Sequence, residues 1–148
     1  NMMLAQTEAS AGRPGAWAIQ PDKNGNLAEG AGNNVFFVKK GVVHTPTDAY
    51  VLPGVSRSVV IEICRDLRIP LVEADVSLHL AMTADEAFFT STSLCVCPVR
   101  SLNGVAYPAD VPGPVTQRIM EAFRDMAQFD FVAQYVRFVT DAPVRGGI

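Results

Sequence analysis

The sequence predicts an α+β domain in which a mixed or antiparallel, barrel-like sheet is flanked by helices. Short apolar runs follow one another with turn signals between them, and Asn24-Gly25 and Asn103-Gly104 are dipeptides typical of β-hairpin turns. Only a few segments carry apolar residues at helical spacing, and these are scattered among the predicted strands. Because hairpins join antiparallel neighbours, we expect antiparallel pairing to dominate the sheet.

The N-terminal part of the chain is expected to contain a helix and then paired strands. Residues 1–11 have helical spacing and end at Gly12 and Pro14, but no N-cap residue precedes Asn1. We therefore expect the chain to be a fragment of a longer protein. Ala16–Ile19 is predicted as a short strand, and residues 34–45 as two strands joined by a tight turn at Lys40-Gly41.

The C-terminal part is expected to alternate helices and strands. Helices are predicted at 56–67 with Ser56 as the N-cap, at 77–86 with Ser77 as the cap, and at 113–128 with Pro114 in the first turn. Strands are predicted at 69–76 and at 87–102, the second interrupted near Thr92-Ser93. The helix at 113–128 is expected to be the last long helix, and residues 140–148 to form a frayed tail.

Composition and charge argue against several classes of protein. The net charge is −3 and the pI is about 5.3, and no basic patch is visible, which argues against nucleic-acid binding. No apolar run approaches the roughly 18 residues that span a bilayer, so no membrane association is expected. The three cysteines form no disulfide framework, which favours a reducing, cytoplasmic compartment.

Glu29 is an acid within a stretch of small residues. Gly30 and Gly32 leave room for another group to approach the backbone closely. The stretch fits a binding site that needs one carboxylate, and it fits equally well a turn with a solvated glutamate.

Two further motifs offer hydrogen-bond donors. LPGVSR, from Leu52 to Arg57, opens a predicted helix, where the N–H groups of Val55 and Ser56 lack intrahelical acceptors and the helix dipole favours an anion. The motif therefore suits a phosphate, although a turn and a capped helix explain it too. FFTSTS, residues 88–93, aligns four hydroxyls that could donate to the same phosphate, although threonine is also a common strand residue.

Other reactive residue types have structural interpretations. Cys95 and Cys97 are expected on one face of a strand as a packed pair of thiols rather than as metal ligands, and no metal site is predicted. Asp85 and Glu86 should face opposite sides of a strand start, which argues against joint acid–base work.

Four more side chains have less specific interpretations. His44 and His79 have no partner at a zinc spacing and are expected as ordinary surface or core residues. Trp17 is expected in the core. Arg57 is expected either to neutralise charge near the phosphate motif or to bond within its own helix region.

Taken in order, the motifs EGAGNN, TP, LPGVSR, ADEAFFTSTS, PV, NG and GPVT resemble the class IV aminotransferases, which are fold type IV pyridoxal-phosphate enzymes. The resemblance runs from about Met3 to Phe123. It implies that residues 1–139 are the C-terminal, cofactor-binding large domain of such an enzyme without its N-terminal domain. It also implies pyridoxal 5'-phosphate as the cofactor and a homodimeric assembly.

The resemblance assigns roles to individual residues. Glu29 matches the acid that faces the pyridine nitrogen. A carboxylate there keeps the ring nitrogen protonated, which makes the cofactor an electron sink. Leu52 matches the residue packed on one face of the ring. Val55, Ser56 and Thr92 match the donors to the phosphate.

Ser93 matches a residue whose backbone N–H lies near the substrate carboxylate. The family binds its cofactor covalently through a lysine just upstream of the NMMLAQTEA segment, and the lysines of this chain, Lys23, Lys39 and Lys40, do not match that position. No catalytic residue is therefore predicted within the chain itself.

The expected function is transamination of a branched-chain-like amino acid with a 2-oxo acid acceptor, by a complete enzyme whose catalytic lysine lies upstream of Asn1. Two alternatives stay open within the family: a lyase of the aminodeoxychorismate type, and a transaminase for D-amino acids or (R)-amines. A third alternative is a non-catalytic, truncated binding module.

Overall fold

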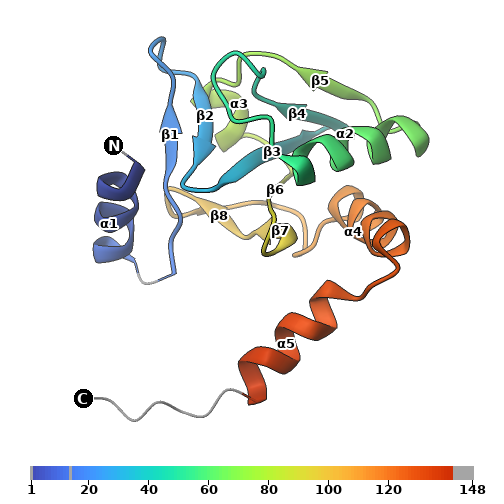
Figure 1. Cartoon of the computed structure of the whole chain (residues 1–148). Helices are drawn as coiled ribbons and strands as arrows, with labels where there is room; N and C mark the ends of the chain where they lie inside the picture. The colour runs from blue at the N-terminus through green and yellow to red at the C-terminus, as the bar shows by residue number, and fades with distance from the viewer. Residues whose placement is uncertain (1, 14, 142–148) are drawn as a thin grey trace.

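The structure, a computed structural model, describes residues 2–13 and 15–141 and shows a mixed sheet with helices packed on both faces (Figure 1). Its helices are α1 (Met2–Gly12), α2 (Val55–Asp66), α3 (Leu78–Met82), α4 (Pro114–Ala127) and α5 (Phe131–Asp141). Its strands are β1 (Ile19–Pro21), β2 (Leu27–Gly30), β3 (Asn33–Lys39), β4 (Val42–Thr45), β5 (Leu71–Glu73), β6 (Glu86–Ser91), β7 (Cys95–Val99), β8 (Ser101–Leu102) and β9 (Val105–Ala106). The predicted α+β class is confirmed.

Strand β3 is the centre of the seven-stranded sheet. It pairs with β2 at its first residues, with β4 at its last residues, and with β6 along most of its length. All of these pairings are antiparallel, whereas β4 and β5 pair in parallel, so the sheet is mixed as predicted. The β3–β4 hairpin turns at Lys40-Gly41, where both residues have positive φ (51° and 77°), as a tight primed turn requires.

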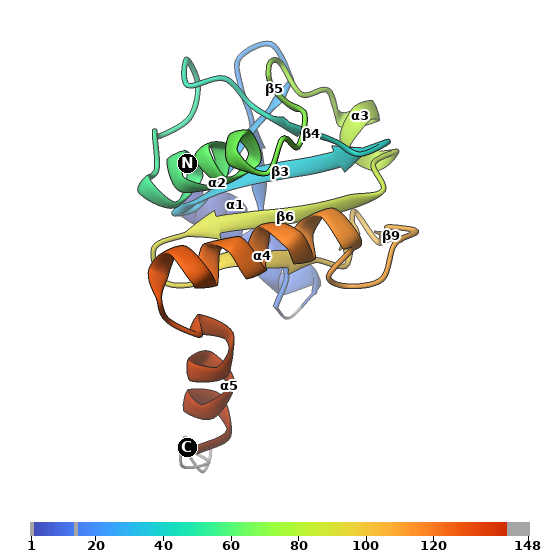
Figure 2. The same ribbon diagram turned by 90° about the vertical axis from the view of Figure 1, so that its right-hand side faces the viewer.

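Each face of the sheet carries its own hydrophobic core. Along β3 the side chains alternate, so that Phe36 and Val38 join the core under α2 and α4, whereas Val35 and Phe37 join the core that includes α3. Phe36 stacks on Phe88 of β6 with ring centroids 4.9 Å apart. Figure 2 shows α2 and α4 lying on the same side of β3 and β6. Because both faces are covered, β3 is an apolar run rather than an alternating strand.

A buried carboxylate accepts hydrogen bonds from the N–H groups at the start of α4. Glu86, only 5% exposed, accepts hydrogen bonds from the N–H groups of Val115 (3.0 Å) and Thr116 (2.8 Å). Its neighbour Asp85 instead accepts from the N–H of Lys40. The two acids therefore serve different elements, which confirms the prediction that they do not act as a pair.

Several local predictions were close. Helix α1, the helix capped by Ser77, the hairpin at Asn103-Gly104 and the break between β6 and β7 all occur, and Pro114 is the first residue of α4. The strand predicted at Ala16–Ile19 was misplaced, because β1 begins only at Ile19. Asn1 and Pro14 lie outside the described residues.

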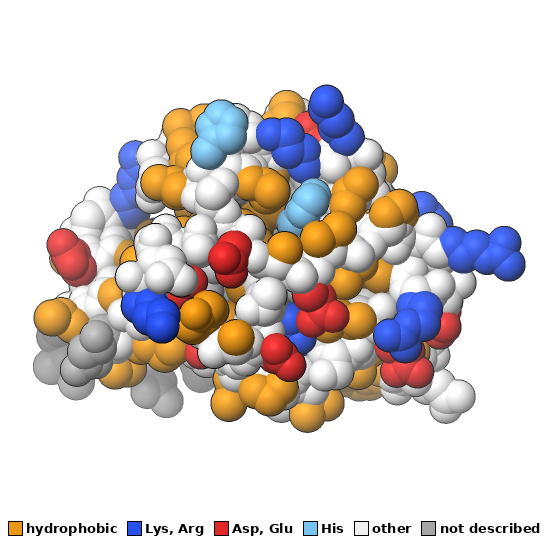
Figure 3. All heavy atoms as spheres, turned by 90° about the horizontal axis from the view of Figure 1, so that it is seen from above, with side chains coloured by type: hydrophobic (Ala, Val, Ile, Leu, Met, Phe, Trp, Pro, Cys, Tyr) orange, Lys and Arg blue, Asp and Glu red, His pale blue; other side chains and the backbone are white. Residues whose placement is uncertain are grey.

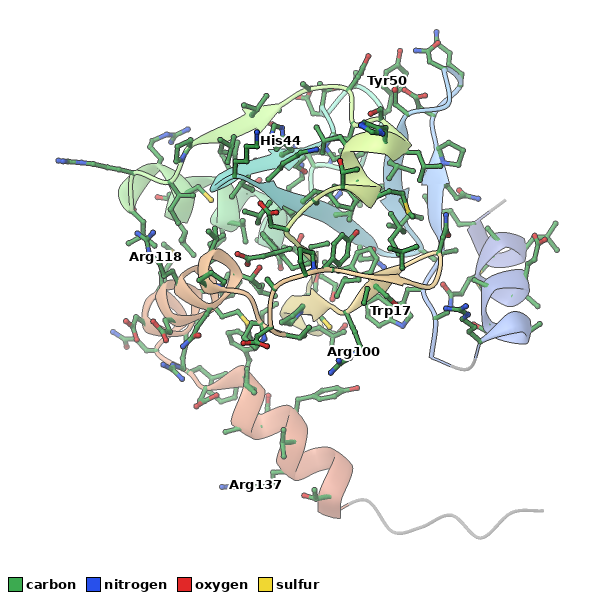
Figure 4. The ribbon with its side chains drawn as sticks, turned by 180° about the vertical axis from the view of Figure 1, so that it is seen from behind. Trp17, His44, Tyr50, Arg100, Arg118 and Arg137 are labelled. Carbon is green, nitrogen blue, oxygen red and sulfur yellow. The ribbon has the colours of Figure 1, made fainter. Side chains whose placement is uncertain are left out.

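Three predictions about side-chain packing and the end of the chain were wrong. Trp17 is not in the core but is 40% exposed, with its ring 5.4 Å from that of Phe89; Figure 4 shows it on the side of the molecule that carries α1. Cys95 and Cys97 pack on different cores rather than on one face, because the positive φ of Cys95 (55°) breaks the strand alternation.

The third error concerns the end of the chain, where α4 is not the last helix. Helix α5 follows it, is anchored by Phe131 against Phe123, and extends away from the sheet (Figures 1 and 2). It includes Thr140 and Asp141, the first residues of the predicted tail, and residues 142–148 lie outside the described part.

Replacing Glu86 with alanine is expected to destabilise the fold by about 2–3 kcal/mol, because two N–H groups at the start of α4 lose a charged acceptor. Urea unfolding followed by circular dichroism would measure this. The control is Glu121→Gln on the exposed side of α4, where the carboxylate accepts only from Gln117. Equal stabilities of the two variants would contradict the capping role of Glu86.

Candidate functional site

Three segments meet where β3 begins and β6 ends. Strand pairing sets Glu29 of β2 opposite Asn34 of β3, and Asn34 opposite Thr90 of β6. The loop before α2 joins this row, because the N–H of Leu52 donates to Glu29 Oε2 over 2.8 Å. The separate motifs EGAGNN, LPGVSR and FFTSTS are therefore neighbours at one end of the sheet.

Glu29 has one oxygen held and one oxygen free of protein partners. Oε2 accepts from Leu52 N and from Asn34 Nδ2, and among the described residues Oε1 has no hydrogen bond. The residue is half-buried, so its carboxylate is fixed by the protein while remaining reachable. Such a group can accept a hydrogen bond from a ligand's protonated nitrogen.

The start of α2 offers unsatisfied N–H groups. The N-cap is Gly54, which supplies no side-chain cap, and the first helical bond runs from Ser58 N to Gly54 O (3.0 Å). The N–H groups of Val55, Ser56 and Arg57 therefore have no acceptor within the helix. The prediction of Ser56 as the N-cap was wrong, because the helix begins one residue earlier, at Val55.

The turn between β6 and β7 adds hydroxyl groups beside this helix start. Ser56 Oγ donates to Ser91 O over 3.0 Å, which ties α2 to the turn. Ser91 Oγ lies 3.3 Å from Ser93 Oγ and accepts from Leu94 N. Thr92 and Ser93 of this turn are both exposed.

Leu52 and Val55 leave a large apolar area exposed at the same place, at 70% and 79% exposure respectively. An exposed leucine next to a fixed carboxylate suits the face of a flat heteroaromatic ring. The chemistry of the donor set, with N–H and hydroxyl groups at one end, an apolar surface between and a carboxylate at the other, fits a phosphorylated pyridine.

Arg57 is positioned differently from both sequence interpretations. It is 4% exposed, and its Nη2 donates to Pro46 O and to Glu73 Oε2, both over 2.8 Å. The side chain thus fastens the first turn of α2 to the preceding loop and to β5. No sequence signal linked Arg57 to Glu73, which lies sixteen positions further along.

A cavity of about 900 Å³ lies elsewhere, between α1, β1, β7 and the β8–β9 hairpin. Its lining includes Trp17, Phe89, Arg100 and Leu102, and none of the predicted site residues. Trp17 and Arg100 lie on this side of the molecule in Figure 4. The cavity is therefore separate from the site at the start of α2.

The surface and the thiols give no other chemistry. Acidic and basic side chains are interspersed on the face shown in Figure 3. Within residues 2–13 and 15–141, no three potential metal ligands cluster, and no helix combines the length and apolar character that crossing a membrane requires. Among the described cysteines none is disulfide-bonded, and burial raises the pKa of Cys95 and of Cys97. His44 is half-buried and His79 is exposed, in keeping with ordinary roles.

The fold and the site together define a class of protein, and comparison with known proteins identifies it. The model of the class IV amino-transferase family matches residues 1–102. The chain belongs to this family, and the predicted resemblance is confirmed.

Individual relatives agree with this family. The chain is 36% identical over 126 residues to a branched-chain-amino-acid aminotransferase of Pseudomonas aeruginosa, covering 85% of this chain and 41% of the relative. The branched-chain amino acid aminotransferase of Escherichia coli superposes with a TM-score of 0.80 at 35% identity, over 87% of this chain and 44% of that one. The enzyme of Thermobaculum terrenum in its PLP form gives 0.81 at 30% identity, over 90% and 44%. The chain thus spans less than half the length of these relatives.

The lyase alternative has support from the fold alone. A putative 4-amino-4-deoxychorismate lyase of Legionella pneumophila superposes with a TM-score of 0.77, but at 22% identity. Neither this likeness nor any described contact favours a lyase over a transaminase.

The stability of the protein is expected to decrease at alkaline pH partly through Cys64. Burial raises the pKa of its thiol from 9.0 to about 11, so the folded chain keeps a proton that the unfolded chain releases. The resulting stabilisation is complete below pH 9.0 and is lost as the pH rises toward 11. Urea midpoints measured at about pH 8 and about pH 10.5 in a reductant should differ less in Cys64→Ala than in the unchanged protein. The same pH dependence in both proteins would contradict this.

Proposed function

We propose that this chain is the cofactor-binding part of a pyridoxal-phosphate-dependent aminotransferase that acts on branched-chain-like amino acids. One observation carries the proposal: the Glu29 carboxylate accepts a hydrogen bond from Leu52 N, directly before the uncapped start of α2. The turn between β6 and β7 with its serine and threonine hydroxyls, here called the hydroxyl turn, is hydrogen-bonded to the same helix start. The relatives named above at 30% identity or more are branched-chain aminotransferases. Solved neighbours include forms with pyridoxal phosphate or pyridoxamine 5'-phosphate, which supports the cofactor.

The phosphate would lie at the start of α2. The N–H groups of Val55 and Ser56 would donate to its oxygens, and the helix dipole would favour its negative charge. The Thr92 hydroxyl, on the exposed turn beside α2, would add a further donor. Because Ser56 Oγ donates to Ser91 O, the start of α2 and the β6–β7 turn are held at a fixed distance from each other.

The ring would lie between this anchor and Glu29. Leu52 would pack against one face of the ring and exclude water from it. Glu29 Oε1 would accept a hydrogen bond from the protonated ring nitrogen. When bound, the cofactor supplies an electron sink for a carbanion at the substrate α-carbon. The backbone N–H of Ser93 would orient the substrate carboxylate.

The lysine that binds the cofactor is proposed to lie upstream of Asn1, in the part of the relatives that this chain does not span. The lysines of the chain are unsuited to the role. Lys39 and Lys40 lie at the far end of β3 from Asn34, and Lys23 lies in the β1–β2 turn, 6.0 Å from the ring centre of Tyr50.

In the complete protein, residues 1–139 are proposed to form the large domain of a cytoplasmic homodimer that uses an amino acid and a 2-oxo acid. The amino group would pass from the amino acid to the cofactor and then to the 2-oxo acid. The transfer of the amino group rests on family membership and on the named relatives. The homodimer follows from the motif resemblance, and the cytoplasmic location from the lack of a disulfide framework among the three cysteines.

The chain is expected to bind pyridoxamine 5'-phosphate saturably, because this ligand needs the anchor and Glu29 but no lysine. Fluorescence titration would measure the Kd, and inorganic phosphate should compete. Glu29→Gln should weaken binding about tenfold or more, since it removes the charge that faces the ring nitrogen. Ser56→Ala should also weaken binding, since it removes the hydrogen bond to Ser91 O that holds the start of α2 beside the β6–β7 turn. The control is Ser101→Ala, which removes a hydroxyl on β8 outside the site and should leave the Kd unchanged. Unchanged affinity in both site variants would refute the assigned roles.

The full-length protein is expected to convert L-leucine to its 2-oxo acid only when 2-oxoglutarate is present. Chromatographic detection of the 2-oxo acid and of glutamate would show it. Release of pyruvate from aminodeoxychorismate without an amino acceptor would instead establish the lyase alternative. An open reading frame with no lysine closely upstream of Asn1 would favour the non-catalytic alternative.

A further inference from the structure

Asn34 lies at the junction of the three segments that build the site. It is the second residue of β3, only 6% exposed, and its backbone pairs with Glu29 on one side and Thr90 on the other. None of the sequence motifs singled out its side chain for a role. Its position makes it the one strand residue that borders both the acid and the hydroxyl turn within the described part of the sheet.

The Asn34 side chain closes a ring of hydrogen bonds. Its Nδ2 donates to Glu29 Oε2 (3.2 Å) and to Leu52 O (2.9 Å), and Leu52 N donates to the same Glu29 oxygen (2.8 Å). Both N–H groups of the amide are thereby used. Glu29 Oε2 therefore has two donors, and Leu52, in the loop before α2, is held through both its N–H and its C=O.

The same amide lies against the N-cap of α2. A Cβ added at Gly54 would overlap Asn34 Oδ1, although the backbone angles of Gly54 (φ −65°, ψ 141°) are open to any residue. Glycine therefore matters here for space rather than for conformation, since any other residue would displace the Asn34 amide. The contact places the start of α2 directly against the residue that holds Glu29.

An asparagine is chemically suited to this position. Its amide offers two donors at a fixed angle, which a carboxylate lacks. Aspartate would have nearly the same shape but would place a second acid next to Glu29. Alanine would leave Leu52 O without its side-chain donor and would remove one of the two donors to Glu29 Oε2.

We propose that Asn34 is a positioning residue that locks the Glu29 carboxylate to the start of α2, and so fixes the spacing between the acid and the phosphate anchor. This inference deepens the proposed function and rests on it for its consequence in binding. The lock itself is a property of the protein without ligand. A ligand that reaches both ends therefore needs Asn34, whereas an anion at α2 alone does not.

The lock is tested first by amide hydrogen exchange in the 148-residue chain without ligand. In Asn34→Ala, exchange of the Leu52 N–H is expected to be about tenfold faster, because its acceptor is no longer held. The matched control is Asn33→Ala. Asn33 is the neighbouring asparagine on the same strand, equally buried at 9% exposure, and its Oδ1 has no hydrogen-bond partner. Unchanged exchange at Leu52 in Asn34→Ala would overturn the inference whatever the ligand does.

The consequence for binding is tested with two probes, pyridoxamine 5'-phosphate and inorganic phosphate. Asn34→Ala and Asn34→Asp are expected to weaken pyridoxamine 5'-phosphate about tenfold or more while changing the phosphate affinity less than about twofold. A general loss of structure would weaken both ligands. Gly54→Ala, which displaces the Asn34 amide, should add little further loss of pyridoxamine 5'-phosphate in combination with Asn34→Ala.

The outcomes separate the inference from the proposed function. If the unchanged chain binds no pyridoxamine 5'-phosphate, the proposed function fails, and the exchange of Leu52 alone decides the lock. If the unchanged chain binds it and the Asn34 variants bind it equally well, the inference fails and the proposed function stands. Full additivity of Gly54→Ala and Asn34→Ala would also count against the inference, because it would mean that the two changes act independently.

Discussion

The antiparallel pairing of β3 with β6 is the interaction on which the rest of the molecule depends. Five residue pairs, from Asn34–Thr90 to Val38–Glu86, set its register. This register stacks Phe36 on Phe88 within one core and sets Val35 opposite Phe89 within the other. A slip by one residue would move every side chain to the opposite face, so Phe36 would no longer stack on Phe88. The same register brings the end of β6 next to the start of β3, where the candidate site lies.

The helix starts differ in whether a side chain accepts hydrogen bonds from their first N–H groups. Helix α3 is capped by its own Ser77, which accepts from Leu80 N, and α4 is capped by Glu86 from a distant strand. Helix α2 has a glycine at its N-cap and no side-chain acceptor. Its free N–H groups would be costly if buried, but they face an exposed turn rich in hydroxyls. This difference supports an anion as the partner of α2.

The sequence was a good guide to short-range features and a poor one to long-range contacts. The turn at Lys40-Gly41 and the cap at Ser77 depend on neighbouring residues only, and both were predicted. The exposure of Trp17 was missed because it depends on what covers Phe89, and the divergence of Cys95 and Cys97 depends on a single left-handed residue. Arg57 could be noticed in the sequence, but its partners Pro46 and Glu73 could not. Helix α5 was not predicted, although its sequence has apolar residues at helical spacing.

The sequence by itself determined the class of fold, the order of the motifs and the family, because turn dipeptides, apolar periodicity and motif spacing are written in neighbouring residues. Only the tertiary structure decided how these motifs meet. The bonds from Leu52 and Asn34 to Glu29, and from Ser56 to Ser91, join residues that are far apart in the chain or lie on different elements. Such bonds depend on strand register and on the packing of α2 against the sheet, and these are set by the burial of both cores rather than by any local pattern.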